Sequence, residues 1–173
     1  MTKLCPARFS AIGTAILLLG TMGSATLVRA EDIVRRQGGD FPIASSIRVP
    51  PGTELVFLSG TLADVVKPDA PAGSIERLGD TETQAASVLG KLAKELAASG
   101  LTMADVVKMN VFMVGDPGKG GTMDFAGLMK AYSKVFGEGT QGQLPTRTTV
   151  QVAGLPVPGA LVEIEVVAAR KRQ

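Results

Sequence analysis

The sequence predicts a single α+β domain with a mixed β-sheet and two helices packed on one face of it. Apolar and polar residues alternate at 105–114, 148–153 and 161–169, which is typical of strands. At 81–99 and 124–136, apolar residues recur at helical spacing instead. With two weaker strands before the first helix, the order is strand, strand, helix, strand, helix, strand, strand. This order favours one sheet whose apolar face is covered by both helices.

The first thirty residues differ from the rest of the chain. Lys3 and Arg8 precede an uncharged, largely apolar run at 9–28, which ends in the small-residue pattern Val28-Arg29-Ala30. This arrangement predicts a signal peptide over residues 1–30 and an exported protein, periplasmic or secreted, without membrane contact after cleavage. An uncleaved membrane anchor is the alternative, because the apolar run approaches spanning length.

The remaining chain has the length of one domain. Residues 31–41 (EDIVRRQGGDF) are charged and contain paired glycines, so we predict a flexible lead-in before a folded domain at 42–173. The chain has 18 basic and 16 acidic residues, and three of the basic residues lie in the leader. The exported part is therefore close to neutral and lacks the basic surface expected for binding nucleic acid.

Two strands are expected before the first helix. The segment 43–49 alternates weakly, and the run Leu55-Val-Phe-Leu58 predicts a short buried strand that Ser59-Gly60 terminates. The first helix begins with Thr81 and Gln84 at the spacing of a capping box.

The last thirty residues contain two alternating segments, 148–153 and 161–169, joined by a Gly/Pro-rich stretch, so we predict a β-hairpin. Its valines are expected to face the core, and its opposite, polar face carries Arg147, Thr149, Gln151 and Glu163. This polar face meets either water or another subunit. An ion pair of Arg147 with Glu163 or Glu165 across the hairpin is one interpretation, and the wall of a binding site is the other.

Missing residue types restrict the chemistry. The chain has no histidine, and its one cysteine, Cys5, lies in the leader. Serine–histidine and cysteine–histidine nucleophilic systems are therefore excluded. A zinc site would need carboxylates alone, so we predict no metal. Any reaction must use arginine, carboxylates, hydroxyls and backbone groups.

An ordered set of segments resembles the RidA (YjgF) family, also named endoribonuclease L-PSP-like. The set comprises Phe57-Leu-Ser-Gly60, the helix from Gln84 onward, Asp105-Val-Val-Lys108 followed by Val111-Phe112, and LPTRTTVQVAGLPVPGALVEIEVVAA at 144–169. The resemblance implies a chorismate-mutase-like α+β fold, assembled as a homotrimer with clefts between subunits. It also implies hydrolysis of small 2-imino acids, or their enamine tautomers, to 2-keto acids and ammonia without metal or organic cofactor.

The resemblance implies that Arg147 binds the substrate carboxylate and that Glu163 positions the attacking water. A guanidinium suits the first role because it is planar, permanently charged and bidentate toward carboxylates. A carboxylate suits the second role because it accepts a proton from an oriented water. Further residues expected to line the cleft are Ser59, Gly60, Pro145, Thr146, Thr149, Ile43 and Met129.

The chain departs from the family pattern at two positions. The family's cleft tyrosine falls near Ile43, and an asparagine commonly stands near Met129, so this cleft should be more apolar. The chain's one tyrosine, Tyr132, lies on the apolar side of the second helix. The leading hypothesis is an enamine/imine deaminase, a hydrolase. The alternative is a non-catalytic trimeric module that binds small carboxylates such as 2-keto acids. RNA cleavage is disfavoured by the near-neutral charge and the lack of histidine.

Overall fold

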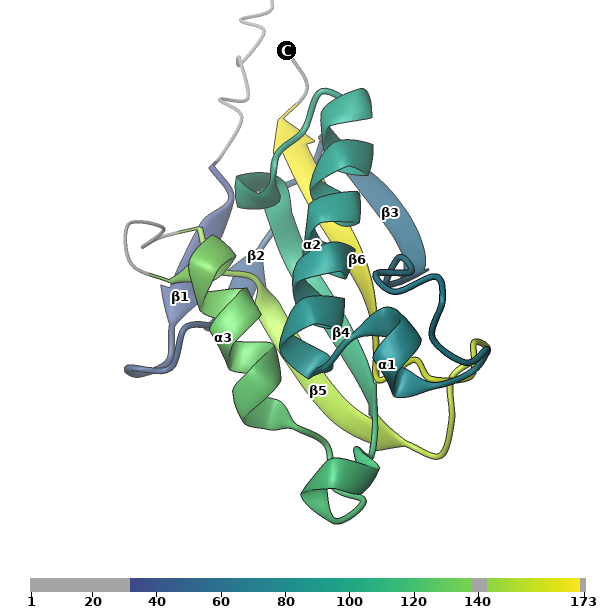
Figure 1. Ribbon diagram of the computed structural model, residues 1–173. Coiled ribbons are helices and arrows are strands. Elements are labelled where there is room, and N and C mark those ends of the chain that lie inside the picture. Colours follow the sequence, from purple (N-terminus) through teal and green to yellow (C-terminus); the bar gives the residue numbers. More distant parts are fainter. Residues whose placement is uncertain (1–31, 138–142, 172–173) are drawn as a thin grey trace, which may run out of the picture.

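The computed structural model describes residues 32–137 and 143–171 (Figure 1). The predicted leader therefore lies outside the described residues. In chain order the elements are β1 (Val34–Gln37), β2 (Ala44–Arg48), β3 (Thr53–Leu62), α1 (Ile75–Leu78), α2 (Thr81–Ala98), η1 (Met103–Asp105), β4 (Val106–Val114), η2 (Pro117–Lys119), α3 (Phe125–Phe136), β5 (Thr146–Val152) and β6 (Val162–Lys171).

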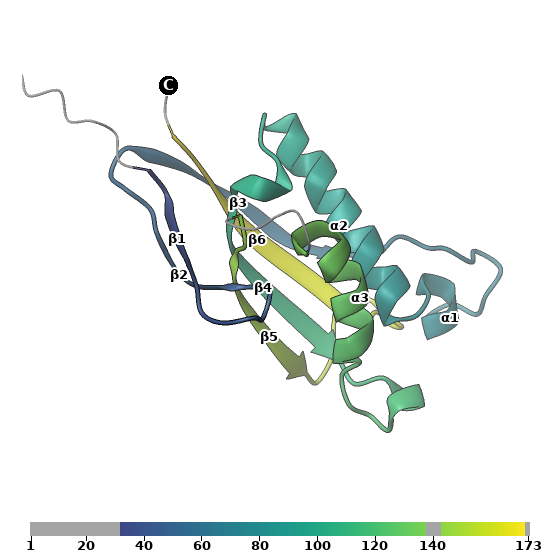
Figure 2. The same cartoon turned by 90° about the vertical axis from the view of Figure 1, so that its left-hand side faces the viewer.

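The main sheet has four strands in the order β3-β6-β4-β5, and β1 and β2 form a separate antiparallel pair. Within the main sheet β4 and β5 are parallel, and the other pairs are antiparallel. Helices α2 and α3 lie side by side over one face of this sheet (Figure 2). The predicted α+β class and mixed sheet are confirmed. No helix of the described part of the chain is long and apolar enough to span a membrane.

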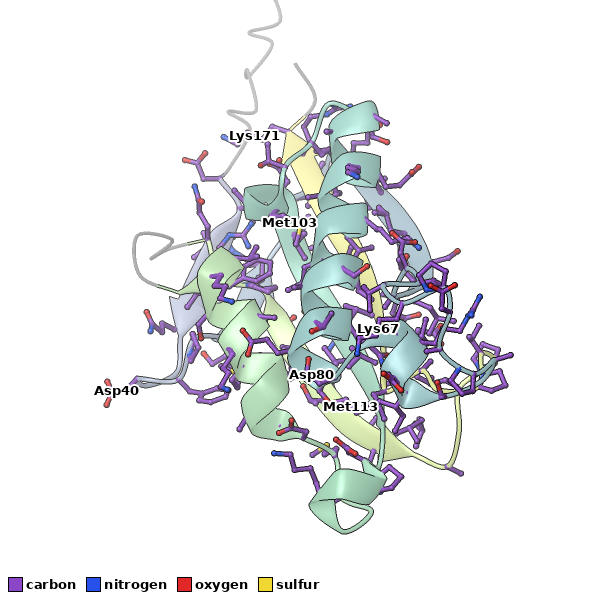
Figure 3. All side chains as sticks on the ribbon, in the orientation of Figure 1. Asp40, Lys67, Asp80, Met103, Met113 and Lys171 are labelled. Carbon is purple, nitrogen blue, oxygen red and sulfur yellow. The ribbon has the colours of Figure 1, made fainter. Side chains whose placement is uncertain are left out.

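Strand β1 stands where a flexible lead-in was expected. It pairs with β2, and the Arg35 guanidinium donates hydrogen bonds to the carbonyls of Ala104, at 2.8 Å, and Val106, at 3.0 Å. These bonds fix β1 to the start of β4. The paired glycines belong to the turn that connects β1 to β2, from which Asp40 projects away from the domain (Figure 3).

The predicted C-terminal hairpin is wrong, because β4 lies between β5 and β6. Alternation identifies a strand but not its neighbour. Residues 153–161 connect the two strands, and a connection of this length crosses one intervening strand, a gap of about 10 Å. The Gly/Pro-rich stretch is therefore a crossover and not a tight turn.

The faces of β5 are also reversed from the prediction. Val150, expected in the core, is 40% exposed. Arg147 is instead aligned with the fully buried Met109 of β4, so it points to the side of the sheet that the helices cover. Period-two alternation shows which residues share a side, but the packing of α3 decides which side is covered.

Strand β3 is an edge strand and not the buried strand that its apolar run predicts. Phe57 is 74% exposed and Leu55 45% exposed. The strand also continues past Ser59-Gly60, where an irregularity in the pairing with β6 lies between Leu58 and Thr61. An apolar run predicts a strand, but it does not show whether another element covers that strand.

Helix α2 matches the predicted helix, but its N-terminus is built differently. Asp80, not Thr81, caps the helix by accepting the Thr83 N–H at 2.9 Å (Figure 3). Gln84 is fully buried: its amide nitrogen donates to the carbonyls of Gly79, at 2.8 Å, and Gly159, at 3.1 Å, and its amide oxygen accepts the Leu161 N–H at 2.8 Å. Gln84 thus joins the start of α2 to the crossover before β6.

Candidate functional site

Arg147 lies in a frame of aromatic side chains on the helix side of the sheet. Its guanidinium carbon is 4.2 Å from the centroid of the Tyr132 ring, 5.3 Å from that of Phe41 and 5.6 Å from that of Phe125. A guanidinium so close to ring faces is held by cation–π attraction. The three rings come from the β1–β2 turn and from α3, so tertiary packing assembles this frame.

The polar contacts of Arg147 leave most of its donors available. Its Nη1 lies 3.3 Å from the sulfur of Met129, a weak acceptor. Arg147 forms no ion pair with any described residue. Burial lowers the pKa of its guanidinium, and the neighbouring Tyr132 opposes this shift, but an arginine remains charged. A partly buried cation with a planar fork of donors is suited to a carboxylate ligand.

Tyr132 connects Arg147 to the β1–β2 turn. Its hydroxyl donates to the carbonyl of Pro42 at 2.8 Å, while its ring lies against the guanidinium. Burial raises the pKa of the Tyr132 phenol to about 12, against the opposing effect of the Arg147 charge, so the hydroxyl stays protonated. The sequence places Tyr132 on the apolar side of its helix, but only the structure shows that this side meets Arg147.

Sequence reasoning missed both phenylalanines of the frame. Phe41 and Phe125 stack with their ring centroids 6.2 Å apart and an angle of 14° between planes. A signal for Phe41 was present, because an aromatic residue directly precedes Pro42, next to the position where the family's tyrosine is missing. For Phe125 the sequence indicated only a place in the apolar stripe of α3 and nothing that relates it to Arg147.

The other residues predicted to line the cleft near Arg147 are divided between the two sides of β5. Thr149 shares the side of Arg147, and its Oγ1 is buried without a hydrogen-bond partner. Thr146 points to the opposite side, and its Oγ1 donates to the carbonyl of Val107 at 3.0 Å. Ile43 packs partly buried against the core, and Met129 contacts Arg147 directly.

Pro145 joins the two sheets at this point. Its carbonyl accepts the Ala44 N–H at 2.9 Å, which ties the start of β2 to the start of β5. This bond, together with the Tyr132 hydroxyl, holds the Phe41–Ile43 segment beside Arg147.

Glu163 belongs to a second group of residues on the open face of the sheet. Glu163 stands between the buried Val162 and Ile164 of β6 and pairs with Phe112 of β4. Because neighbouring side chains of a strand point to opposite faces, Glu163 points away from the helices. Its carboxylate lies against Gly60, where a Cβ atom would come within 1.9 Å of the Glu163 Oε1. Gly60 therefore leaves the space in which the carboxylate sits.

Ser59, next to Gly60 in the chain, lines a cavity of about 270 Å³. Lys108, Asn110 and Glu165 line the same cavity, and Asn110 Nδ2 donates to Glu165 Oε1 at 2.7 Å. Glu165 therefore already has a hydrogen-bond partner on the open face of the sheet. A pairing of Arg147 with Glu163 or Glu165, one of the two sequence interpretations, is wrong because the arginine lies on the other face.

Substitution of Gly60 by alanine tests the position of the Glu163 carboxylate. The added methyl displaces a flexible side-chain end, so we expect less than about 1 kcal/mol loss in the free energy of unfolding. If Glu163 acts on a bound substrate, the displacement should lower the turnover rate about tenfold to hundredfold. Chemical unfolding and a rate assay measure the two effects.

Gly90→Ala is the matched control for this substitution. Gly90 lies in α2, and a Cβ there meets no atom within 4 Å. The control should keep the full rate and gain up to about 1 kcal/mol of stability. An unchanged rate in Gly60→Ala would show that the place of the Glu163 carboxylate does not matter for turnover.

The two groups do not meet within one chain. Arg147, its aromatic frame, Met129 and Thr149 lie on the helix-covered side, whereas Ser59, Gly60, Thr146 and Glu163 lie on the open face. The described residues contain no cluster of three or more His, Cys, Asp or Glu side chains that could hold a metal ion.

Comparison with known proteins relates this arrangement to a family. A family model described as Endoribonuclease L-PSP matches residues 47–170. The chain is 36% identical over 127 residues to Protein DfrA of Myxococcus xanthus, covering 73% of this chain and 84% of that protein. It is 36% identical over 117 residues to TdcF of Escherichia coli K12, which is named a reactive intermediate deaminase, covering 67% of this chain and 79% of TdcF.

Two solved structures show the same fold at comparable identity. Escherichia coli TdcF with bound serine superposes with a TM-score of 0.52 at 32% identity, covering 82% of this chain and 100% of that one. The Pseudomonas aeruginosa protein PA3499 gives a TM-score of 0.53 at 30% identity, covering 79% and 89%. The resemblance inferred from the C-terminal segment and the preceding strands is confirmed, and the chain belongs to the RidA/YjgF family, the Endoribonuclease L-PSP family.

Proposed function

We propose that the chain is an enamine/imine deaminase that hydrolyses 2-imino acids to 2-keto acids and ammonia. The observation that carries this proposal is the Arg147 guanidinium, which aromatic rings frame and which has no ion-pair partner among the described residues. Its free donors fit the carboxylate that every 2-imino acid carries. The name of TdcF and its structure with serine, an amino acid, support a site of this kind.

The proposed reaction needs a water and a proton acceptor beside the bound substrate. Water attacks the carbon of the protonated imine, and the Glu163 carboxylate accepts the proton that this water loses. The same proton then passes to the amino group of the resulting carbinolamine. The carbon–nitrogen bond breaks as the hydroxyl of the carbinolamine gives its proton to the Glu163 carboxylate, which leaves a ketone and ammonia. Glu163 then passes this proton to the ammonia, which leaves as ammonium. Arg147 keeps hold of the carboxylate through these steps and undergoes no change itself.

We further propose that each site is formed by two copies of the chain. Arg147 and Glu163 point to opposite faces of one sheet, so only Glu163 of a second copy would approach Arg147. An interface that joins two different surfaces of the same chain forms a ring when the rotation between copies closes and an open filament when it does not, and a homotrimeric ring is proposed here. The open face supports such contact, because Leu55, Phe57 and Val150 are apolar and exposed on it.

Mixing two inactive variants tests both proposals. Purified wild-type protein should accelerate the loss of 2-iminopropanoate that an amino-acid oxidase generates in situ, and Arg147→Ala and Glu163→Gln should each abolish this. Co-expressed at equal levels, the two variants should recover about a quarter of the wild-type activity, because random assembly pairs an intact Arg147 with an intact Glu163 at one interface in four. Light scattering on each sample measures the assembly state.

The outcomes separate the hypotheses. If 2-iminopropanoate is lost no faster with the wild-type protein than in the protein-free control, the deaminase proposal is refuted. Calorimetric binding of pyruvate or 2-oxobutanoate without turnover would then support the non-catalytic binding module. An active wild type whose co-expressed variants recover nothing would instead refute the site shared between two copies.

A further inference from the structure

The surroundings of Arg147 also indicate which 2-imino acids the site accepts. We infer that it takes substrates with a large apolar side chain, such as those derived from leucine or phenylalanine, and that Phe41 is the residue that selects them. This inference rests on the proposed function and departs from the small substrates that the family resemblance implies. Three features of the Arg147 frame carry it.

The first feature is the exposure of Phe41. Its ring is 46% exposed although it lies 5.3 Å from the guanidinium carbon and stacks on Phe125. Tyr132, in contrast, is fully buried beneath the arginine. A substrate whose carboxylate binds Arg147 carries its side chain on the neighbouring carbon, within reach of the exposed part of the Phe41 ring. An apolar substituent there would remove ring surface from water.

The second feature is the weak hydrogen-bonding capacity of the side chains that contact the guanidinium in the described structure. The Tyr132 hydroxyl is engaged with the carbonyl of Pro42 at 2.8 Å. The Met129 sulfur is at most a weak acceptor. A hydroxyl or carboxylate on the substrate side chain would lose its water here without gaining a partner, which disfavours polar substrates.

The third feature is that the polar side chains farther along β5 are either buried or already hydrogen-bonded. The Thr149 Oγ1 is buried, so a ligand does not reach it without a rearrangement. The side-chain amide of Gln151 is occupied on both atoms, since its oxygen accepts the Met123 N–H at 2.8 Å and its nitrogen donates to the carbonyl of Gly121 at 3.0 Å. The helix side of β5 in one copy of the chain therefore offers a substrate one charged group and, among the described residues, no polar side chain that is both accessible and unpaired.

Calorimetric binding of three 2-keto acids tests the inference, with pyruvate, 4-methyl-2-oxopentanoate and phenylpyruvate as probes. Wild-type protein should bind the two larger acids at least about tenfold more tightly than pyruvate, a ratio that one hydrophobic contact supplies. Phe41→Ala should reduce this ratio about tenfold, and any effect that it has through the contact of Phe41 with Arg147 should weaken the binding of all three acids alike. Oxidase-generated imines of alanine, leucine and phenylalanine should show the same order in turnover.

Two further variants serve as controls. Phe41→Leu retains an apolar side chain and should keep most of the preference for 4-methyl-2-oxopentanoate. Val65→Ala removes a 45% exposed apolar side chain from the loop before α1, and it should leave all three affinities unchanged.

The inference and the proposed function fail in different ways. Equal affinities for pyruvate and phenylpyruvate, or a ratio that Phe41→Ala leaves unchanged, would overturn the inference while Arg147-dependent binding remains. If the wild type binds none of the three acids, the carboxylate site itself is refuted, and the inference falls with it.

Discussion

Replacement of Arg147 by alanine is expected to lower the affinity for 2-keto acids, and the rate of imine hydrolysis, by about a hundredfold or more. Removal of one partner from a desolvated, charge-assisted pair costs about 2–5 kcal/mol, which corresponds to about thirtyfold to a few thousandfold in affinity. We expect Arg147 to exceed the lower end of this range, because it is partly buried and no second cation of the described residues lies over the three rings. Calorimetry with 2-keto acids and the imine assay measure both losses.

The conservative variant separates charge from geometry. Arg147→Lys keeps the positive charge but loses the planar fork and its stacking on Tyr132, so we expect about a tenfold loss in affinity. Arg36→Ala is the matched control, because Arg36 is an exposed arginine of β1. Circular dichroism should show all three variants folded. Wild-type affinity in folded Arg147→Ala would contradict the assignment of the carboxylate site.

Replacement of Gln84 by leucine is expected to cost the largest amount of stability. The variant leaves the carbonyls of Gly79 and Gly159 and the N–H of Leu161 without their present partner in a buried place. Each unsatisfied buried group costs about 1–3 kcal/mol, and partial relaxation makes a total of about 3–5 kcal/mol reasonable. Urea unfolding at a fixed protein concentration measures this loss, because any self-association also contributes to stability.

A second glutamine provides the control for this experiment. Gln151 makes two comparable hydrogen bonds, but it is exposed, so water replaces the lost partners. Gln151→Leu should therefore cost less than about 1 kcal/mol. Similar losses in the two variants would show that burial of the Gln84 network does not govern its contribution.

Most of the secondary structure could be predicted from the sequence because it depends on local patterns of apolar and polar residues. The apolar periodicity of 81–99 and 124–136 corresponds closely to α2 and α3, and the alternation at 105–114 corresponds to β4. The N-terminus of α2 shows the limit of local reasoning. Asp80 and Thr81 are both residue types that cap helices. Asp80 is the cap here, and Gln84 cannot complete a capping box with Thr81 because its side chain makes buried hydrogen bonds elsewhere.

The site was only partly accessible from the sequence. Arg147 and Glu163 were found because they stand in a segment that resembles a known family. Such a resemblance can be recognised without knowing to which face of the sheet each side chain points. The aromatic frame was not found, since Phe41, Phe125 and Tyr132 are far from Arg147 in the chain. No periodicity relates residues that only long-range packing brings together.

The sequence by itself determined the family, the class of fold, the positions of the main strands and helices, and the two charged residues that the proposed function uses. These follow from local patterns and from an ordered set of motifs. Only the tertiary structure decided that β4 separates β5 from β6, that Arg147 faces the helices while Glu163 faces the open side, and that three aromatic rings surround the arginine. The physical reason is that alternation records which side chains share a face, whereas strand order and helix packing decide what each face meets.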